Sequence, residues 1–498
     1  MTWFAGTQRA AAVAVGLLAL LPLAYVATGL IEAGGDTASL VLRPRVGELL
    51  TNTVVLVVLG VAACVLIGTA AAWLVERTDL PGRPLWTALL IAPLAVPAFV
   101  NSFGWFSLRP SFSGLGAALT VTTLSYYPLV YLPVAAVLRG GDPAHEEIAR
   151  SLGHTISRTF VRVTLPQLRP AVLGGGLLVG LHLLAEFGAL QSLRYDTFTT
   201  AIYDQYQSTF DGSAATALAA VLVLLCLLLL GGELAFNRQT RLSRTGSGTA
   251  RPPRRHPLPA RPLWVVALAL LPLAALGVPI GTLVHWLLTS TSAAFPAGPL
   301  LSATGTTLML ALGGAAVTTA LALPVAWLVV RRRGRLSTVI ERSTYVGNSL
   351  PGIVVALALI TAGIRWLPAL YQSTAMLLTA YGLLFLPRAM VSLRAALQQA
   401  PPELDDVGRS LGVRPHAVLL RVGLPLIARG LGAGFVLVFL AVVTELTSTL
   451  LLAPIGTRTL ATQFWNATSE INYGAAAPYA LLMILISAPA AWLLVRRA

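Results

Sequence analysis

The sequence contains no lysine and little charge. All 34 basic residues are arginine, acidic residues number 19, and charged residues make up only 11% of the 498 positions. Ordinary soluble domains carry roughly 25% charged residues. Apolar residues reach 56%, and a polar surface cannot cover that much apolar material. The composition therefore excludes a soluble multidomain enzyme and indicates a polytopic membrane protein.

The absence of lysine also excludes several kinds of chemistry. A P-loop needs a lysine to reach phosphates, and Schiff-base catalysis needs a lysine amine. The only two cysteines, Cys64 and Cys226, lie within apolar runs and form neither a disulfide framework nor a zinc site. We therefore expect a chain that is not an enzyme and binds no cofactor. If ATP drives it, a separate protein hydrolyses the ATP.

Twelve apolar runs are long enough to cross a bilayer, whose core of about 30 Å needs about 20 helical residues. They are roughly 11–31, 52–74, 87–107, 115–138, 171–192, 214–236, 263–289, 303–330, 343–364, 373–394, 429–452 and 475–495. The first run is longer than the apolar region of a signal peptide, so we expect it to be a true span.

Arginine placement predicts the orientation of these spans, since cytoplasmic loops carry the positive excess. With the N-terminus inside, only six arginines fall outside and the other 28 lie on the cytoplasmic side. The outer six are Arg43, Arg45, Arg109, Arg194, Arg365 and Arg458. We expect both termini to be cytoplasmic. The net charge of +15 then reflects topology, and no nucleic-acid partner is expected.

The chain repeats itself. Residues 72–75 (Ala-Trp-Leu-Val) recur at 326–329, an offset of 254, and residues 150–153 (Arg-Ser-Leu-Gly) recur at 409–412, an offset of 259. Each copy has six runs, and an even number keeps both copies in one orientation. We therefore predict an all-α polytopic membrane protein of twelve transmembrane helices in two parallel six-helix repeats, 1–236 and 263–498. The Arg- and Pro-rich stretch 237–262 is expected to be a cytoplasmic, largely flexible linker.

A cytoplasmic loop follows the fourth run of each repeat, at 139–170 and at 395–428. In the first loop, Pro143 suits the first turn of a short helix with acids behind it. Gly153 suits a left-handed helix stop, and Pro166 marks the return to the membrane. Pro402, Gly412 and Pro425 have the same places in the second loop. Each loop is therefore predicted to be a helical hairpin that projects from the bilayer.

These loops resemble the EAA loop of permease subunits in binding-protein-dependent ABC importers, and with it the whole chain resembles this family. The matching residues are Glu147, Gly153, Val163, Leu165 and Pro166 in the first loop, and Asp406, Gly412, Val422, Leu424 and Pro425 in the second. Two departures are Ile148 where alanine is usual, and Asp406-Val407-Gly408 in the second loop.

The resemblance implies a set of partners. Each loop, with Arg150 and Arg409 inside it, would be a coupling helix seated in one of two copies of a cytoplasmic ABC ATPase, which holds ATP-Mg. An extracytoplasmic solute-binding protein would deliver the substrate. The location implied is the bacterial cytoplasmic (inner) membrane, with the chain inserted as a multi-pass protein in the lipid bilayer.

The substrate class rests on softer similarities. Two permease halves in one chain are typical of importers resembling the ferric-iron, thiamine and aminoethylphosphonate systems. Residues 185–189, 196–203, 350–354 and 444–452 resemble the ferric-iron type most. The resemblance therefore implies an importer permease for ferric iron, with thiamine or aminoethylphosphonate as the alternatives.

Two acids lie within apolar runs at equivalent repeat positions, Glu186 and Glu445. An acid is rare inside a membrane span. Either the pair lines the substrate path, or each acid reaches the outer interface or bonds a neighbouring helix. The residues 197–206 recur at 457–466, an offset of 260, and predict short outer helices. Tyr203 there is either a path residue or an interfacial anchor.

Matching prolines add two candidates for the path, because Pro97 and Pro351 free backbone groups that can face a cavity. No metal site is assigned, since His182 and His285 are more typical of structural hydrogen bonds. A twelve-span secondary transporter, with Glu186 and Glu445 as ion carriers, is the alternative from another class of protein.

Overall fold

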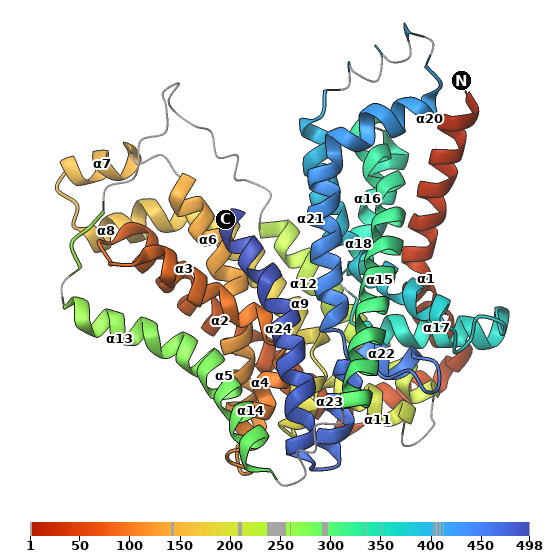
Figure 1. The fold of residues 1–498 in the computed structure, drawn as a ribbon, viewed down its shortest axis with the longest axis horizontal. Coiled ribbons are helices and arrows are strands. Elements are labelled where there is room, and N and C mark those ends of the chain that lie inside the picture. Colours follow the sequence, from red (N-terminus) through yellow and green to blue (C-terminus); the bar gives the residue numbers. More distant parts are fainter. Residues whose placement is uncertain are drawn as a thin grey trace. The chain divides into compact units, whose positions relative to one another are not determined.

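The structure, a computed structural model, describes most of the chain. The described residues are 2–140, 144–207, 212–236, 255–258, 260–290, 297–332, 334–348, 350–401, 403, 407, 410–411 and 413–497. Across these ranges the regular secondary structure is helical, apart from one isolated β-bridge between Thr78 and His256. The all-α fold class is thus confirmed (Figure 1).

Nine helices in the described part of the chain are long and apolar enough to cross a membrane, or ten if one bent pair counts as a single span. Each of the twelve predicted runs coincides with helix. Two of the runs correspond to shorter apolar helices, Gly352–Trp366 and Tyr473–Pro489. The bent pair, Arg83–Ala95 and Ala98–Phe106, turns through 90°.

Proline produces the two main departures from straight spans. Pro97 and Pro351 are equivalent at the 254 offset, and each is the extended N-cap residue of the helix that follows. A proline before a helix fixes φ and disfavours helical geometry in the residue preceding it. The helix therefore starts anew after Pro97 and again after Pro351. The sequence predicted freed backbone groups at these prolines, and the structure has helix breaks there.

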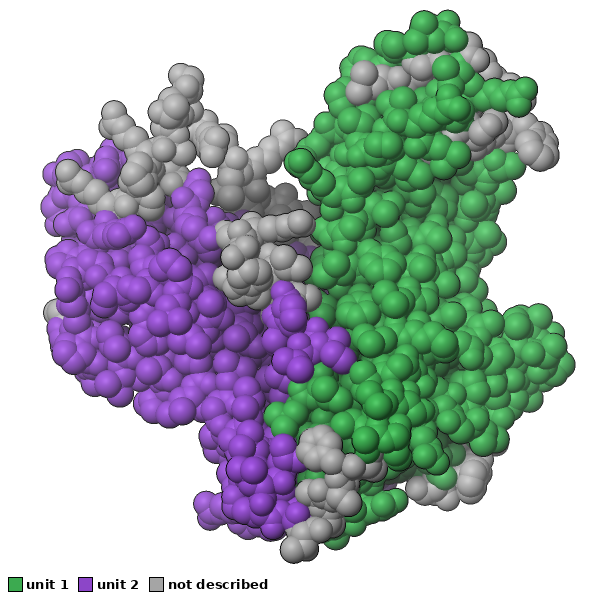
Figure 2. Space-filling model, in the orientation of Figure 1, with its two compact units in different colours: residues 1–42, 202–223, 291–483 green, residues 43–201, 224–290, 484–498 purple. Residues whose placement is uncertain are grey.

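The chain divides into two compact units, shown in different colours in Figure 2. Unit 1 contains residues 1–42, 202–223 and 291–483, and unit 2 contains residues 43–201, 224–290 and 484–498. Three helices contribute to both units: α11 (Phe198–Gln207), α12 (Gly212–Phe236) and α24 (Tyr473–Arg497).

Unit 2 is built on three helices that pack against one another, namely α2, α6 and α9. Glycines allow this approach, because a Cβ at Gly68 would lie 2.9 Å from the Tyr127 carbonyl oxygen and one at Gly175 2.9 Å from Val130 Cα. The elements of the unit are α2 (Pro44–Arg77), α3 (Arg83–Ile91), η1 (Ala92–Ala95), α4 (Ala98–Phe106), α5 (Gly114–Tyr126), α6 (Pro128–Gly140), α7 (Ala144–Ser151), α8 (Ile156–Thr159), η2 (Phe160–Thr164), α9 (Leu165–Ala185), α10 (Gly188–Ser192), α13 (Arg261–Pro272), η3 (Leu273–Gly277) and α14 (Val278–Thr289).

Unit 1 has the equivalent three-helix centre, formed by α15, α18 and α21. Its elements are α1 (Thr2–Val41), α15 (Ala297–Arg331), α16 (Arg335–Asn348), α17 (Gly352–Trp366), α18 (Thr374–Gln399), α20 (Pro415–Val418), η4 (Leu419–Gly423), α21 (Leu424–Val443), α22 (Thr447–Leu452) and α23 (Leu460–Ser469). The repeat seen in the sequence is therefore also a repeat of helix packing.

The first helix of each repeat packs in the unit formed mainly by the other repeat. The helix α1 contacts α15, α16 and α17 in unit 1, whereas α14 contacts α4 and α13 contacts α3 in unit 2. Gly104 of α4 lies so close to α14 that a Cβ there would come 2.4 Å from Pro279 Cα. The compact units therefore do not follow the repeat boundaries 1–236 and 263–498.

The described end of the expected linker, residues 255–258 and 260–262, is ordered against α2 or belongs to α13. Residues 255–258 bond to the end of α2, and α13 already begins at Arg261. The remainder of the stretch, 237–254 and 259, lies outside the described residues.

A wide, π-helical turn precedes three prolines in the same way. The turns η2, η3 and η4 each end two residues before a proline: Pro166, Pro279 and Pro425. Leu165 N–H donates to the Phe160 carbonyl and Val278 N–H to the Leu273 carbonyl, one residue further back than in an α-helix. A proline ring collides with the carbonyl four residues earlier, and the wider turn relieves that clash. Two of these turns, η2 and η4, join the loops 139–170 and 395–428 to α9 and α21.

Candidate functional site

The described part of the loop 139–170 forms the predicted hairpin, with α7, α8, η2 and the start of α9. The helix α7 ends in a left-handed turn, where Gly153 has φ +86°. Gly153 N–H donates to the Arg150 carbonyl and His154 N–H to the Ala149 carbonyl, the two bonds of a glycine C-cap. The role expected for Gly153 in the backbone is confirmed. After this turn, Thr155 caps the start of α8, because its side-chain oxygen accepts a hydrogen bond from the Arg158 N–H.

Two adjacent acids of α7 face opposite ways. Glu147, the acid of the EAA pattern, is exposed to solvent. Glu146 is buried, and its Oε1 lies 3.2 Å from Arg77 NH2 and accepts a 2.8 Å hydrogen bond from Thr164 Oγ1. Glu146 therefore fastens both arms of the hairpin to the end of α2, while Glu147 is free to meet a partner.

More ion pairs fix the C-terminal end of α2. The buried carboxylate of Glu76 pairs with Arg83 at 2.5 Å and with Arg139 at 3.0 Å. These residues come from α2, α3 and α6, so the hairpin stands on a base that three helices hold together. Buried charges are costly unless they are paired and hydrogen-bonded. At this base the carboxylates of Glu76 and Glu146 are each paired with arginine.

An apolar triplet of aliphatic side chains lies exposed on the first hairpin. Ile148 is 58%, Leu152 74% and Val161 58% exposed. The equivalents at the 259 offset on the second hairpin are Val407, Leu411 and Leu420, with exposures of 52%, 75% and 59%. Exposed apolar groups outside the spans mark an interaction surface. Ile148 departs from the EAA pattern, but it is exposed and aliphatic, as is its counterpart Val407 on the second hairpin.

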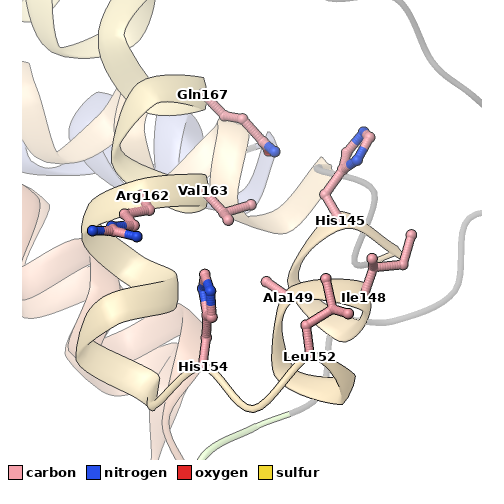
Figure 3. Close-up of a pocket in the computed structure, with 8 residues that line it drawn as sticks. All are labelled: His145, Ile148, Ala149, Leu152, His154, Arg162, Val163 and Gln167. Atoms are coloured by element: carbon pink, nitrogen blue, oxygen red, sulfur yellow. The ribbon is translucent and has the colours of Figure 1, made fainter.

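A hollow of about 380 Å³ lies between α7 and the arm formed by η2 and α9 (Figure 3). Its lining residues are His145, Ile148, Ala149, Leu152, His154, Arg162, Val163 and Gln167. In the close-up, His154 stands between the two arms, and the ring of His145 lies at the opposite rim (Figure 3). The hollow is therefore lined by apolar side chains together with two histidines and one arginine, a mixture that suits a protein partner.

The described part of the second hairpin has the same join to the membrane. Leu424 and Pro425 follow the π-turn η4, as Leu165 and Pro166 follow η2. The side chain of Leu165 is 38% exposed. Three residues expected to contact an ATPase in this hairpin, Asp406, Arg409 and Gly412, lie outside the described residues.

The in-span acid of the first repeat caps a helix break. The helix α9 ends at Ala185, and Glu186 has extended geometry with φ −71° and ψ 124°. Its Oε1 accepts from the Ala189 N–H at 2.9 Å, its Oε2 accepts from the Tyr126 hydroxyl, and its carbonyl accepts from Thr199 Oγ1 at 2.6 Å. The carboxylate thus accepts hydrogen bonds from a backbone N–H just after the break and from the Tyr126 hydroxyl.

Glu445 does the same in the second repeat. Its carboxylate accepts from the Ser448 N–H at 3.0 Å and the Thr449 N–H at 3.2 Å, at the start of α22. Thr449 Oγ1 is 2.8 Å from the Tyr381 hydroxyl, and Ser448 Oγ donates to the Gly352 carbonyl at 3.1 Å. Both acids thus bond to protein groups at the breaks, and their place on the substrate path stays a prediction.

The other candidates for the path are spread along the chain. Tyr203 is partly buried in α11, and Pro97 and Pro351 begin α4 and α17. The outer helices correspond at an offset of 262, not the predicted 260. Thr197 N–H donates to Thr200 Oγ1 in the same way as Thr459 N–H donates to Thr462 Oγ1. Among the described residues, no group of three His, Cys, Asp or Glu side chains is arranged to hold a metal ion.

The repeat, the two hairpins and the apolar helices agree with what the sequence comparison finds. The family described as binding-protein-dependent transport system inner membrane component matches residues 65–242 and 318–496. The chain belongs to this family. Each match omits the first helix of its repeat, which is the helix that packs in the other unit. Family membership identifies an inner-membrane transport component and removes the alternative of an ion-coupled secondary transporter.

The relatives of this chain differ in how much of its length they match. The Fe(3+)-transport system permease protein FbpB 2 of Haemophilus influenzae is 38% identical over 478 residues, 95% of this chain and 94% of that protein. The sulfate transport system permease protein CysT of Salmonella typhimurium is 33% identical over 36% of this chain and 70% of its own length. The molybdenum transport system permease protein ModB of Escherichia coli is 29% identical over 36% of this chain and 87% of its own length.

Sequence reasoning missed Glu146, Arg77 and the apolar triplet. A signal was present, because Glu146 has Asp405 and Arg77 has Arg331 at the repeat offsets 259 and 254. Repetition of an acid next to the motif acid, and of an arginine at a helix end, would have suggested an ion pair. The exposure of Leu152 could not have been inferred, because leucine in a helix normally packs inward.

Proposed function

We propose that this chain is the permease subunit of an ATP-driven importer of ferric iron. The observation that supports the iron assignment is the similarity to the Fe(3+)-transport permease of Haemophilus influenzae, which spans both halves of this chain. The sulfate and molybdenum permeases resemble little more than a third of it. Thiamine and aminoethylphosphonate remain the alternative substrates, since fused permeases resembling this one are also typical of those importers.

We propose further that two copies of a cytoplasmic ABC ATPase dock on the two hairpins. Exposed aliphatic groups at equivalent positions, Ile148, Leu152 and Val161 with Val407, Leu411 and Leu420, support two like docking surfaces. The ATPase holds ATP-Mg, and this chain binds no cofactor. Glu147 and Arg150 supply charges on the same helix as Ile148, and Asp406 and Arg409 are their counterparts in the sequence of the second hairpin.

The geometry suggests how force from the ATPase enters the membrane. When ATP closes the ATPase, the first hairpin moves as a body, because Glu146 holds both of its arms. Movement passes to α9 through η2 and to α2 through Arg77. The join at Leu424 and Pro425 serves the same purpose for α21. Both termini are cytoplasmic in this proposal, and a solute-binding protein docks on the opposite side.

The two acid-capped breaks border the substrate path in this proposal. Glu186 and Glu445 hold short helices, α10 and α22, at equivalent places. Pro97 and Pro351 interrupt the neighbouring helices at equivalent places too. Unwound backbone at membrane depth is tolerated where it lines a cavity or is buried in protein. We include Tyr203, on the outer helix α11, among the residues at the mouth of the path.

Uptake of radiolabelled ferric iron tests the substrate. Cells that lack this gene and other iron importers are complemented with the wild-type gene, and uptake of iron, thiamine and aminoethylphosphonate is measured in parallel. The proposal expects restored iron uptake and unchanged uptake of the other two. Restoration of thiamine or aminoethylphosphonate uptake without iron uptake would reject iron and retain the importer.

A further inference from the structure

A four-residue strap, Arg255–Leu258, crosses the cytoplasmic end of α2. His256 N–H donates to the Arg77 carbonyl at 2.8 Å, and Asp79 N–H donates to the His256 carbonyl at 3.1 Å. Leu258 N–H donates to Asp79 Oδ1 at 3.0 Å, and the same carboxylate pairs with Arg261 at the start of α13. The strap is thus bonded at several points, directly beside the base of the first hairpin.

The side chain of His256 joins the strap to the hairpin. The residue is 8% exposed, and its ring stacks on Trp73 with centroids 6.5 Å apart. Trp73 in turn meets the edge of Phe160, in η2, at 5.8 Å. On the other side, His256 Nδ1 lies 3.3 Å from Arg150 NH1. One imidazole therefore contacts α2 and α7 together, and Trp73 extends the contact to η2.

The contact with Arg150 specifies the protonation state of His256. A guanidinium nitrogen only donates hydrogen bonds, so Nδ1 is the acceptor and must lack a proton. His256 is consequently neutral in this arrangement, with its hydrogen on Nε2. A protonated imidazole donates from both nitrogens and would present its Nδ1 hydrogen to the Arg150 guanidinium.

The charges around His256 also favour the neutral form. Arg150 of α7 and Arg77 of α2 are the nearby cations, and Glu146 of α7 is the opposing anion. Two nitrogens of Arg77, Nε and NH1, have no hydrogen-bond acceptor, so Glu146 does not satisfy all the donors already buried there. Asp79 is engaged by Leu258 and Arg261, and Arg255 is a further cation of the strap. Burial lowers the pKa of His256, Arg150 and Arg77 lower it further, and Glu146 opposes them.

We propose that His256 is a positioning residue of the first hairpin, whose neutral imidazole holds Arg150 in place for the ATPase and releases it on protonation. Coupling through this hairpin then weakens as the cytoplasm becomes acidic. The inference rests on the proposed docking of an ATPase on the hairpin. It assigns the folded end of the linker a role in regulation of that contact.

The direction of the pH dependence follows from linkage. A free histidine titrates near 6.5, and the docked one titrates lower. Below pH 6.5, His256 therefore binds more protons when the strap is detached from the hairpin than when the strap is docked on it. The contribution of His256 is complete above that value and declines as pH falls toward the lower pKa of the docked residue. The decline is at most about tenfold per pH unit, because one proton is involved.

The test uses the complete permease with its ATPase in lipid nanodiscs, between pH 5.5 and 8. ATPase stimulation by the iron-loaded binding protein is measured for wild type and for His256→Asn. The Asn amide oxygen replaces the acceptor at Nδ1 but does not titrate. We expect the two to agree within about twofold at pH 7.5, and the ratio of wild type to His256→Asn to fall several-fold by pH 5.5. His256→Lys, a permanent cation, is expected to be impaired several-fold even at pH 7.5.

A matched control is His285→Asn, which makes the same substitution at an exposed position of α14. It should follow the wild-type pH profile. An unchanged profile in His256→Asn would overturn the proposal, as would an equal loss at every pH in both His256 variants, because that pattern indicates a purely structural role. Glu147→Arg is measured beside them. If it leaves stimulation intact, the docking proposal itself is at fault and not the assignment of His256.

Discussion

Arg77 at the end of α2 forms an ion pair with Glu146 of α7, with NH2 3.2 Å from Oε1. The two residues are far apart in the sequence, and their side chains are only 4% and 11% exposed. This pair fixes the first hairpin to a helix of the three-helix centre of unit 2. A hairpin held by a buried ion pair moves together with α2 when a force acts on it. A loop without such a contact would deform instead.

The adjacent acids of α7 should have separable effects when substituted. Glu146→Ala leaves Arg77 buried without its counter-charge, which costs about 3–5 kcal/mol. Glu147→Ala removes an exposed charge and should alter stability by less than about 0.5 kcal/mol. Hydrogen exchange over residues 144–164 should therefore accelerate strongly for the first variant only, while ATPase binding falls in both. Equal exchange rates in the two variants would refute the anchoring role of Glu146.

The apolar triplet should dominate ATPase affinity. Burial of a leucine side chain is worth about 1.5–3 kcal/mol, so Leu152→Asp should weaken binding roughly tenfold to a hundredfold. Leu411→Asp should do the same on the second hairpin. Binding is measured with purified ATPase and the permease in nanodiscs. The matched control is Leu42→Asp, an exposed leucine between α1 and α2, which should bind the ATPase as the wild type does.

The acid-capped breaks offer a third prediction. Glu186→Gln and Glu445→Gln keep a side-chain oxygen that accepts from the backbone N–H groups, so transport should remain within a few-fold of wild type. Glu186→Ala and Glu445→Ala lose the cap, at about 0.5–2 kcal/mol each, and transport should fall further. Transport is measured as iron uptake at matched protein levels. Loss in the Gln variants equal to that in the Ala variants would show that the negative charge itself is needed.

The sequence predicted the helices well, because long apolar runs bounded by arginine, glycine and proline leave few alternatives. It also predicted the hairpin and the left-handed turn at Gly153, since local residue chemistry determines both. The sequence also marked the positions of two helix breaks, at Pro97 and Pro351. Only the structure shows that the helices on either side of the first break are bent by 90°.

Other features depend on contacts between distant segments. An apolar helix such as α1 looks the same whichever bundle it joins, so its packing against α15, α16 and α17 left no trace in its sequence. The opposite orientations of Glu146 and Glu147 depend on Arg77. The strap was expected to be flexible because residues 237–262 are rich in arginine and proline, yet His256 finds Trp73 and Arg150 beside it.

Transport by reconstituted complexes tests whether this chain imports ferric iron at the expense of ATP. Proteoliposomes contain the permease, its ATPase and an internal or external supply of ATP, and radiolabelled ferric iron is supplied on the binding protein. We expect ATP-dependent iron uptake by wild type and by Glu470→Arg, an exposed charge reversal at the end of α23. We expect loss of both ATPase retention and uptake in the double variant Glu147→Arg/Asp406→Arg. Iron uptake that continues in the double variant, or that needs no ATP, would contradict the account.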